Sequence, residues 1–174
     1  MKYLQSKYVK IALAVLINVY AIYQFTQGNI GNGIALMLLS SIPILLYFRN
    51  EFILLAFLRL RKQDFEGTKK WLSKIVDPET ALIKKQQGYY NYLHGIIYSQ
   101  INLTQAEKYF RKALQLGLNM SYDIAMAKLS LAGIMIQKRR KREAQELLAE
   151  AKKLDKQNMM TEQIKMMQQQ LKRI

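Results

Sequence analysis

The chain contains a long run without any charged side chain, from Ile11 to Phe48. This run holds no Asp, Glu, Lys or Arg, and all 12 acidic residues of the 174-residue chain come after it. About 20 apolar residues suffice to cross the hydrocarbon core of a bilayer, whereas an ordinary soluble domain is about a quarter charged. The run therefore predicts a membrane segment and excludes an ordinary soluble protein.

The uncharged run is too long for one membrane span. As a single helix it would measure about 57 Å, nearly twice the roughly 30 Å core. Between Thr26 and Gly33, three glycines alternate with asparagines, and both residue types tolerate turn dihedrals. We therefore expect a two-helix transmembrane hairpin within residues 1–48, with spans at about 8–25 and 34–48. The second span would begin at Ile30 if the turn is tight.

Basic residues near the span ends predict the orientation, because loops rich in Lys and Arg stay in the cytoplasm. The loop between the spans has none, while the two flanks carry Lys2, Lys7, Lys10, Arg49, Arg59, Arg61 and Lys62. We expect an integral membrane protein with both termini cytoplasmic, in a bacterial inner membrane or, alternatively, an organelle membrane. A cleaved signal peptide competes for the first span, but no A-x-A-like site follows that span and a second apolar segment comes directly after it.

The remaining residues, 49–174, read as an all-α domain with a formal charge of +12. Apolar residues recur there at spacings of three and four, with one proline and no alternating strand pattern. Thr104, with Glu107 three residues later, matches a capping box. A helix should therefore run from Gln105 to Leu116, with Thr104 as its N-cap.

Two stretches of this domain share a spacing of small and large apolar residues, Ala106-x3-Phe110-x2-Ala113 and Ala144-x3-Leu148-x2-Ala151. Each follows a helical stretch, which contains Gly95-x2-Tyr98 in the first case and Leu131-Ala132-x2-Met135 in the second. The pattern resembles the tetratricopeptide repeat (TPR). The resemblance implies helix pairs stacked in a short α-solenoid, with the small residues where two helices cross. It is partial, because the first unit is one residue short between Gly95 and Ala106. The ungapped register would place His94 at the crossing, where it would be crowded.

The resemblance divides the domain into three parts. Residues 49–80 are membrane-proximal helices with a degraded repeat, residues 81–156 hold two TPR-like repeats, and residues 157–174 form a C-terminal capping helix. The last helix carries one apolar stripe, Met160, Ile164, Met167, Leu171 and Ile174. We expect this stripe to pack on Leu147, Leu148 and Leu154; a methionine-rich stripe can alternatively bind varied partners.

In the TPR family the first helix of each pair lines a groove that binds a protein segment. The resemblance assigns to this groove Tyr89, Tyr92, Ile96, Ser99, Met126, Leu129, Ile136 and Gln137. These side chains are mostly aromatic and aliphatic, which favours a hydrophobic peptide or helix as the partner. Alternatively, the chain's own residues 52–58 fill the groove.

Five consecutive basic residues form a second candidate surface, Lys138, Arg139, Arg140, Lys141 and Arg142. They form either a solvated loop or a site for anionic lipid headgroups or an acidic partner. Nucleic acid is less favoured, because no aromatic residues are interleaved with them as stacking platforms.

Residues that could carry chemistry are scarce. The chain has one histidine, His94, and no cysteine, so metal centres built from several His or Cys side chains are excluded, and no phosphate-binding loop occurs. We expect no enzyme activity, cofactor or metal. The sequence favours a membrane-anchored adaptor or scaffold that binds a protein partner on the cytoplasmic face. The alternative is an accessory subunit whose hairpin packs into a larger membrane complex of the transporter or insertase type.

Overall fold

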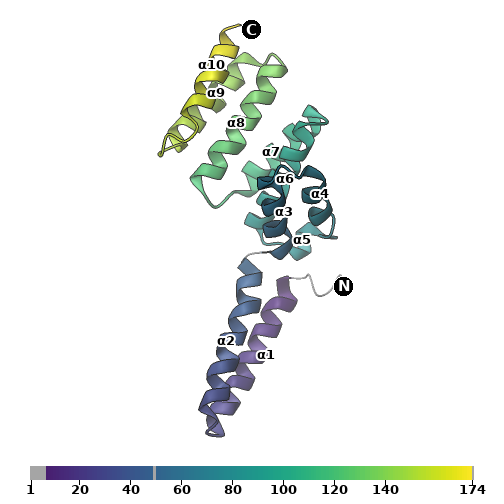
Figure 1. Ribbon diagram of the computed structural model, residues 1–174, viewed down its shortest axis with the longest axis vertical. Coiled ribbons are helices and arrows are strands. Elements are labelled where there is room, and N and C mark those ends of the chain that lie inside the picture. Colours follow the sequence, from purple (N-terminus) through teal and green to yellow (C-terminus); the bar gives the residue numbers. More distant parts are fainter. Residues whose placement is uncertain (1–6, 49, 174) are drawn as a thin grey trace. The chain divides into compact units, whose positions relative to one another are not determined.

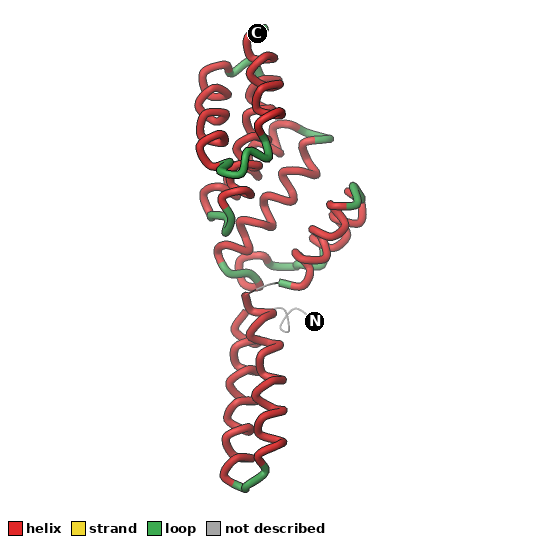
Figure 2. The backbone as a smooth tube through the Cα atoms, turned by 60° about the vertical axis from the view of Figure 1, so that its left-hand side comes forward, coloured by secondary structure: helices red, strands yellow, loops and turns green. Residues whose placement is uncertain are grey.

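The structure is a computed structural model that describes residues 7–48 and 50–173. Within those residues it holds ten α-helices and no strand (Figures 1 and 2), so the predicted all-helical class is confirmed. The chain divides into two compact units, Met1–Gln86 and Gln87–Ile174. Lys2, Arg49 and Ile174, which entered the sequence predictions, lie outside the described residues.

The first two helices, α1 (Lys7–Thr26) and α2 (Ile30–Phe48), form an antiparallel hairpin (Figure 1). Their turn is only residues 27–29, shorter than the predicted interruption. It is tight because Gly28 adopts a φ of +76°, and because the amide of Asn29 donates to the carbonyl of Gln24 at 3.0 Å. The later glycines of the Gly-Asn segment therefore belong to α2, which begins at Ile30.

Small residues form the contact between α1 and α2. Ala14 and Ala21 are buried on α1, and Gly33 and Ser40 are buried on α2. In each helix the two residues lie seven positions apart, a spacing that keeps one face turned toward a partner helix. A Cβ atom on Gly33 would come within 2.7 Å of the Phe25 ring. The helices thus approach closely through small side chains, as is typical of membrane helices.

Most large apolar side chains of the hairpin point outward. Leu16 and Leu38, for example, are each 67% exposed. Only 17% of the most apolar 18 residues of each helix is buried, whereas the core helix of a soluble protein would be mostly buried. The structure therefore contains two helices that are long and apolar enough to span a membrane.

Two short helices and a single helical turn follow the hairpin: α3 (Glu51–Arg61), α4 (Phe65–Leu72) and α5 (Pro78–Ala81). Asn50 caps α3 by accepting hydrogen bonds from the amides of Phe52 and Ile53. Asp64 caps α4, accepting from the amide of Gly67 at 2.7 Å. Side-chain caps of this kind satisfy amides that a helix leaves unpaired at its start.

Helices α3 and α4 pack against each other. The Phe52 and Trp71 rings stack with their centroids 6.2 Å apart, and the Thr68 hydroxyl lies 3.4 Å from the Ala56 carbonyl oxygen. The buried residues of this pair are Ile53, Ala56, Thr68 and Leu72. Part of the apolar segment 52–58 is therefore buried against α4.

The second unit contains the larger part of α6 (Lys84–Ser99), followed by α7 (Leu103–Leu116), α8 (Ser121–Gln137), α9 (Lys141–Leu154) and α10 (Thr161–Lys172). The capping box predicted at Thr104 is wrong. Helix α7 is capped by Asn102, which accepts from the amides of Thr104 and Gln105 at 3.0 and 3.1 Å. Asn is a preferred N-cap residue, and it starts the helix earlier than predicted.

Helices α6 and α7 cross at Gly95. A Cβ atom there would lie 2.9 Å from the ring of Phe110, which is fully buried. The gapped repeat register, which places Gly95 and not His94 at the crossing, agrees with this contact. The other small repeat positions, Ala106, Ala113, Ala132, Ala144 and Ala151, have no exposed surface.

The stripe on α10 faces the rest of its unit. Met160 and Ile164 belong to one buried cluster with Leu129, Leu148 and neighbouring alanines. The residues packed around that cluster are Met126, Leu147, Leu154 and Met167. The Asp155 carboxylate accepts from the amides of Met159 and Met160 at 3.0 and 2.7 Å, which holds the entry to α10.

Candidate partner-binding surfaces

A tyrosine on α6 and an aspartate on α8 join these two helices. The Tyr89 hydroxyl donates a hydrogen bond to the Asp123 carboxylate and accepts one from the Asn119 amide at 3.2 Å. Burial, followed by the hydrogen bond to Asp123, raises the pKa of Tyr89 to about 12. The hydroxyl therefore stays protonated and remains a donor at neutral pH.

Only part of the predicted groove is accessible. Tyr92, Leu129 and Ile136 are buried, with exposed fractions of 5%, 3% and 8%, so assigning them to an open surface is wrong for this structure. Four other predicted residues are half-buried, Tyr89, Ile96, Ser99 and Met126, while Gln137 is exposed.

The burial of Leu129 and Ile136 follows from the position of α8. This helix contacts α7, α9 and α10, and so buries residues on several of its sides. A groove-lining helix would keep one open face. Tyr92 is buried for another reason: its ring packs edge-on against Phe110, with the centroids 6.0 Å apart.

An accessible surface does remain at the start of α8. Met120 is 60% exposed and Tyr122 is 40% exposed, next to the bond between Tyr89 and Asp123. Burial, and then the charges of Asp123, Tyr122 and Tyr89, raise the pKa of Tyr92. We call the set Tyr89, Met120, Tyr122 and Asp123 the tyrosine–aspartate surface. The sequence signal for this surface is the pair Tyr122-Asp123 in the first turn of α8, together with Tyr89 on α6.

A second aromatic group lies across α6 and α7. His94 stacks on Tyr109 with the centroids 5.1 Å apart and contacts Tyr90 edge-on at 4.5 Å, while Tyr98 stacks on Tyr109 at 5.2 Å. Burial and then the neighbouring Tyr109 and Tyr98 raise the pKa of Tyr90. Tyr90, His94 and Tyr98 follow one another at four-residue spacing, a signal that sequence reasoning overlooked. His94 is thus part of an aromatic stack.

The basic segment from Lys138 to Arg142 is largely neutralised by ion pairs. Lys138 Nζ lies 2.7 Å from a Glu107 oxygen, and Arg140 contacts Glu107 at 3.0 Å and Glu143 at 2.6 Å. Arg142 pairs with Glu146 at 3.3 Å. Arg139 and Lys141 are exposed, and no acidic side chain among the described residues pairs with them. Three of the five basic residues therefore pair with acidic side chains of the same domain, and Arg142 remains largely exposed in its pair.

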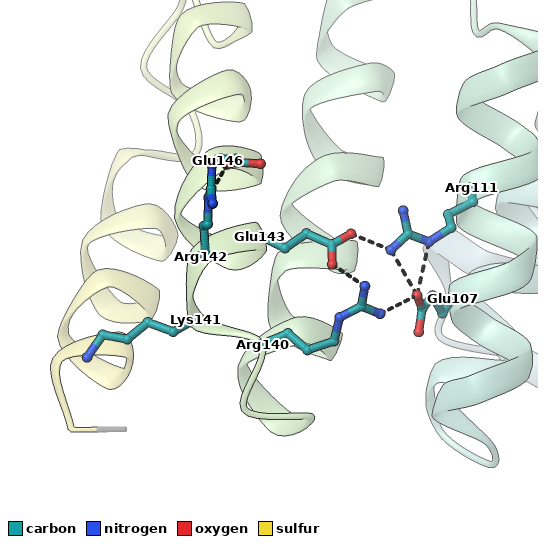
Figure 3. A pocket seen from close by; sticks show the side chains of 7 residues that line it. All are labelled: Glu107, Arg111, Arg140, Lys141, Arg142, Glu143 and Glu146. Carbon is teal, nitrogen blue, oxygen red and sulfur yellow. Dashed lines mark hydrogen bonds and ion pairs between the residues drawn. The ribbon is translucent and has the colours of Figure 1, made fainter.

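Glu107 and Glu143 each lie between Arg111 and Arg140, so that four charges from α7, α9 and the turn before α9 form a closed network (Figure 3). Burial opposes the ionisation of Glu107, yet hydrogen bonds from Lys138 and Arg111 lower its pKa below the ordinary value. The hydrogen bond to Glu143 raises the pKa of Arg111. An open hollow of about 850 Å³ adjoins this network, and Lys141 points away from the ion pairs (Figure 3).

Among the described residues, no group of three or more His, Cys, Asp or Glu side chains is placed to hold a metal ion. The chain matches no family model, no curated protein and no solved structure.

Proposed function

We propose that this protein is a membrane-anchored adaptor that binds a segment of a partner protein on the cytoplasmic face. The observation that carries the membrane part is the outward apolar surface of α1 and α2, where Leu16 and Leu38 are two-thirds exposed. In water, such a surface would cost about 25 cal/mol per Å². A bilayer removes that cost without any further protein.

The orientation follows from charge. Lys7 and Lys10 lie at the start of the first span, Arg59, Arg61 and Lys62 follow the second, and residues 27–29 carry no charge. Loops rich in Lys and Arg stay in the cytoplasm, so we propose that α3 to α10 lie in the cytoplasm and that the hairpin spans a bacterial inner membrane. Because the chain has no cysteine, a single Gln27→Cys variant tests this directly. An impermeant maleimide should label it in intact cells and should leave Lys156→Cys unlabelled; the reverse pattern would overturn the orientation.

The partner-binding role rests on the helix pairs α6–α7 and α8–α9, which resemble tetratricopeptide repeats, and on the tyrosine–aspartate surface. Exposed Met120 adapts to varied apolar side chains, while Tyr122 supplies a rigid aromatic ring of the kind enriched at binding hot spots. We propose that an apolar side chain of the partner segment packs between these two. Anchoring raises the effective concentration of such a segment near the membrane.

The test uses full-length protein with a photo-crosslinking residue in the tyrosine–aspartate surface. Met120→Asp with Tyr122→Asp should abolish crosslinked partners while the protein remains in the membrane fraction. Ile101→Asp is the matched control, because Ile101 is 70% exposed but lies in the turn between α6 and α7. Unchanged recovery with the double variant would reject this surface. Tyr92 and Leu129 are unsuitable targets, since a buried Asp would unfold the domain.

One observation favours the accessory-subunit alternative. An apolar groove of about 400 Å³ runs along the hairpin, lined in part by Val15, Val19, Ile22 and Ile44. A transmembrane helix of a larger complex would fit there. Filling the groove with Val15→Trp should then release the protein from that complex, whereas Leu38→Trp, outside the groove, should not. Equal retention of both variants would count against the alternative.

A further inference from the structure

Helix α3 has an exposed face of unusual composition for a cytoplasmic helix. Leu54 and Leu58 are 51% and 48% exposed, and Arg61 follows three residues later, so the three lie on one face. The opposite face, with Ile53 and Ala56, is buried against α4. Apolar residues flanked by basic ones are the pattern of a helix that lies in a membrane interface.

The first turn of α3 is joined to the start of the first span. Glu51 lies three residues before Leu54, and its carboxylate accepts a hydrogen bond from Lys10 Nζ at 2.9 Å. Lys10 is 8% exposed and also donates to the carbonyl of Leu46 at 3.2 Å. One ammonium group therefore connects the cytoplasmic ends of α1 and α2 to the first turn of α3. Leu54 and Leu58 continue from this junction.

The two basic residues at the C-terminal end of this face, Arg61 and Lys62, are not neutralised by the part of the protein that the structure describes. Arg59 pairs with Asp64 at 3.4 Å, but Arg61 and the adjacent Lys62 have no acidic partner among the described residues. Both are exposed. Basic side chains near an anionic bilayer surface each contribute about 1 kcal/mol, and long basic side chains keep their charge in water while their stems cover apolar surface.

From this arrangement we propose that the face of α3 formed by Leu54, Leu58, Arg61 and Lys62 binds the anionic headgroup layer of the membrane. The proposal rests on the membrane anchoring proposed above. The leucines insert at the level of the acyl boundary, and the two cations contact lipid phosphates. Continuity with the hairpin through Glu51 and Lys10 selects the bilayer as the occupant of this face.

The experiment attaches one nitroxide spin label at a time to the full chain, which has no cysteine of its own. The protein is held in lipid nanodiscs that each contain one copy of the chain. Discs contain phosphatidylcholine alone or an equal mixture with phosphatidylglycerol. Three sites are compared: Leu58→Cys on the proposed face, Leu38→Cys in the span, and Glu66→Cys on the exposed side of α4. Collisions with oxygen report an apolar environment, and collisions with a nickel chelate report water.

The label at Leu58 should resemble that at Leu38 in the anionic discs. Arg61→Gln with Lys62→Gln should reduce the ratio of docked to undocked α3 about fivefold for each charge removed, and 1 M salt should have a similar effect, because it shortens the Debye length to about 3 Å. Lys69→Gln with Lys70→Gln is the matched control. It removes the same charge from the exposed side of α4, and the single Trp71 reports in every variant that α3 and α4 still pack.

Each other outcome overturns a separate claim. If Leu38 is accessible to water, the membrane anchoring itself fails. If Leu38 is in lipid but Leu58 behaves like Glu66 in both kinds of disc, only the proposal for α3 fails. If Leu58 becomes shielded from both collision agents only in discs with two copies, the face is a contact between copies of this chain and the lipid proposal is rejected.

Discussion

Gly95 on α6 and the ring of Phe110 on α7 meet where the two helices cross. A Cβ atom on Gly95 would lie 2.9 Å from two carbons of that ring, and Phe110 has no exposed surface. Phe110 has no open space into which it can rotate, so the close approach of α6 and α7 depends on the absence of a side chain at position 95.

We predict that Gly95→Ala destabilises the second unit by about 1–3 kcal/mol, the usual cost of overpacking a core. Gly133→Ala is the matched control. Its Cβ would meet only the terminal methyl of Met167 at 3.4 Å, and Ala gains up to about 1 kcal/mol in helix propensity. Urea unfolding of the full chain in micelles, followed by circular dichroism, measures both. Equal stability of the two variants would show that the crossing is not tight.

Gly33 in the hairpin should respond less strongly than Gly95. A Cβ there would lie 2.7 Å from Phe25, but the atoms concerned are at the outer edge of a half-exposed ring that can swing outward. Gly33→Ala should therefore cost about 1 kcal/mol or less, and Gly31→Ala, with nothing within 4 Å, should cost nothing. Thermal unfolding in micelles checks this order. A Gly33→Ala loss larger than that of Gly95→Ala would contradict it.

Tyr89→Phe should destabilise the contact between α6 and α8 by about 1–3 kcal/mol, because the Asp123 carboxylate loses its donor. The pKa of Tyr89 is raised above the ordinary value of 10.0 to about 12. The contribution of the protonated Tyr89 hydroxyl to the free energy of unfolding is therefore complete below pH 10 and is lost as the pH rises from 10 through 12. A difference titration at 295 nm between wild type and variant should show one tyrosine ionising near pH 12. Tyr122→Phe, which alters an exposed ring, should leave the stability unchanged.

Glu107→Gln should weaken the packing of α7 on the turn before α9 by on the order of 1 kcal/mol at pH 7. The pKa of Glu107 is lowered below 4.5 in the folded state. Its stabilising effect is thus present above pH 4.5 and disappears as the pH falls further. The variant should lose this part of the acid dependence of stability. Glu162→Gln, which breaks an exposed pair with Lys165, is the control. If both variants show identical acid profiles, the network does not contribute.

Helices α7 and α9 were predictable from the sequence because small and large apolar residues recur at helical spacing around Ala106 and Ala144. Helix ends were less predictable. Thr104 matched a capping motif, yet Asn102 could cap as well, and the side chain of Glu107 is held by cations from the far end of the next helix. A local motif cannot register such distant partners.

The candidate surfaces show the same limit. Leu129 lies on a helix whose apolar residues occur on nearly all sides, so periodicity alone did not show which side would stay open. The structure covers α8 with α7, α9 and α10. The tyrosine–aspartate surface was missed because Tyr89 and Asp123 are far apart along the chain and meet only after folding.

The sequence by itself determined that residues 11–48 form two apolar helices and that the rest of the chain is helical, because a long uncharged run is stable only out of water and helical periodicity is a local property. Only the tertiary structure decided which apolar residues stay exposed, such as Leu54 and Met120, and which cations are neutralised, such as Lys138 and Arg140. Burial and ion pairing depend on side chains that are distant along the chain, and their distances are set by the packing of whole helices.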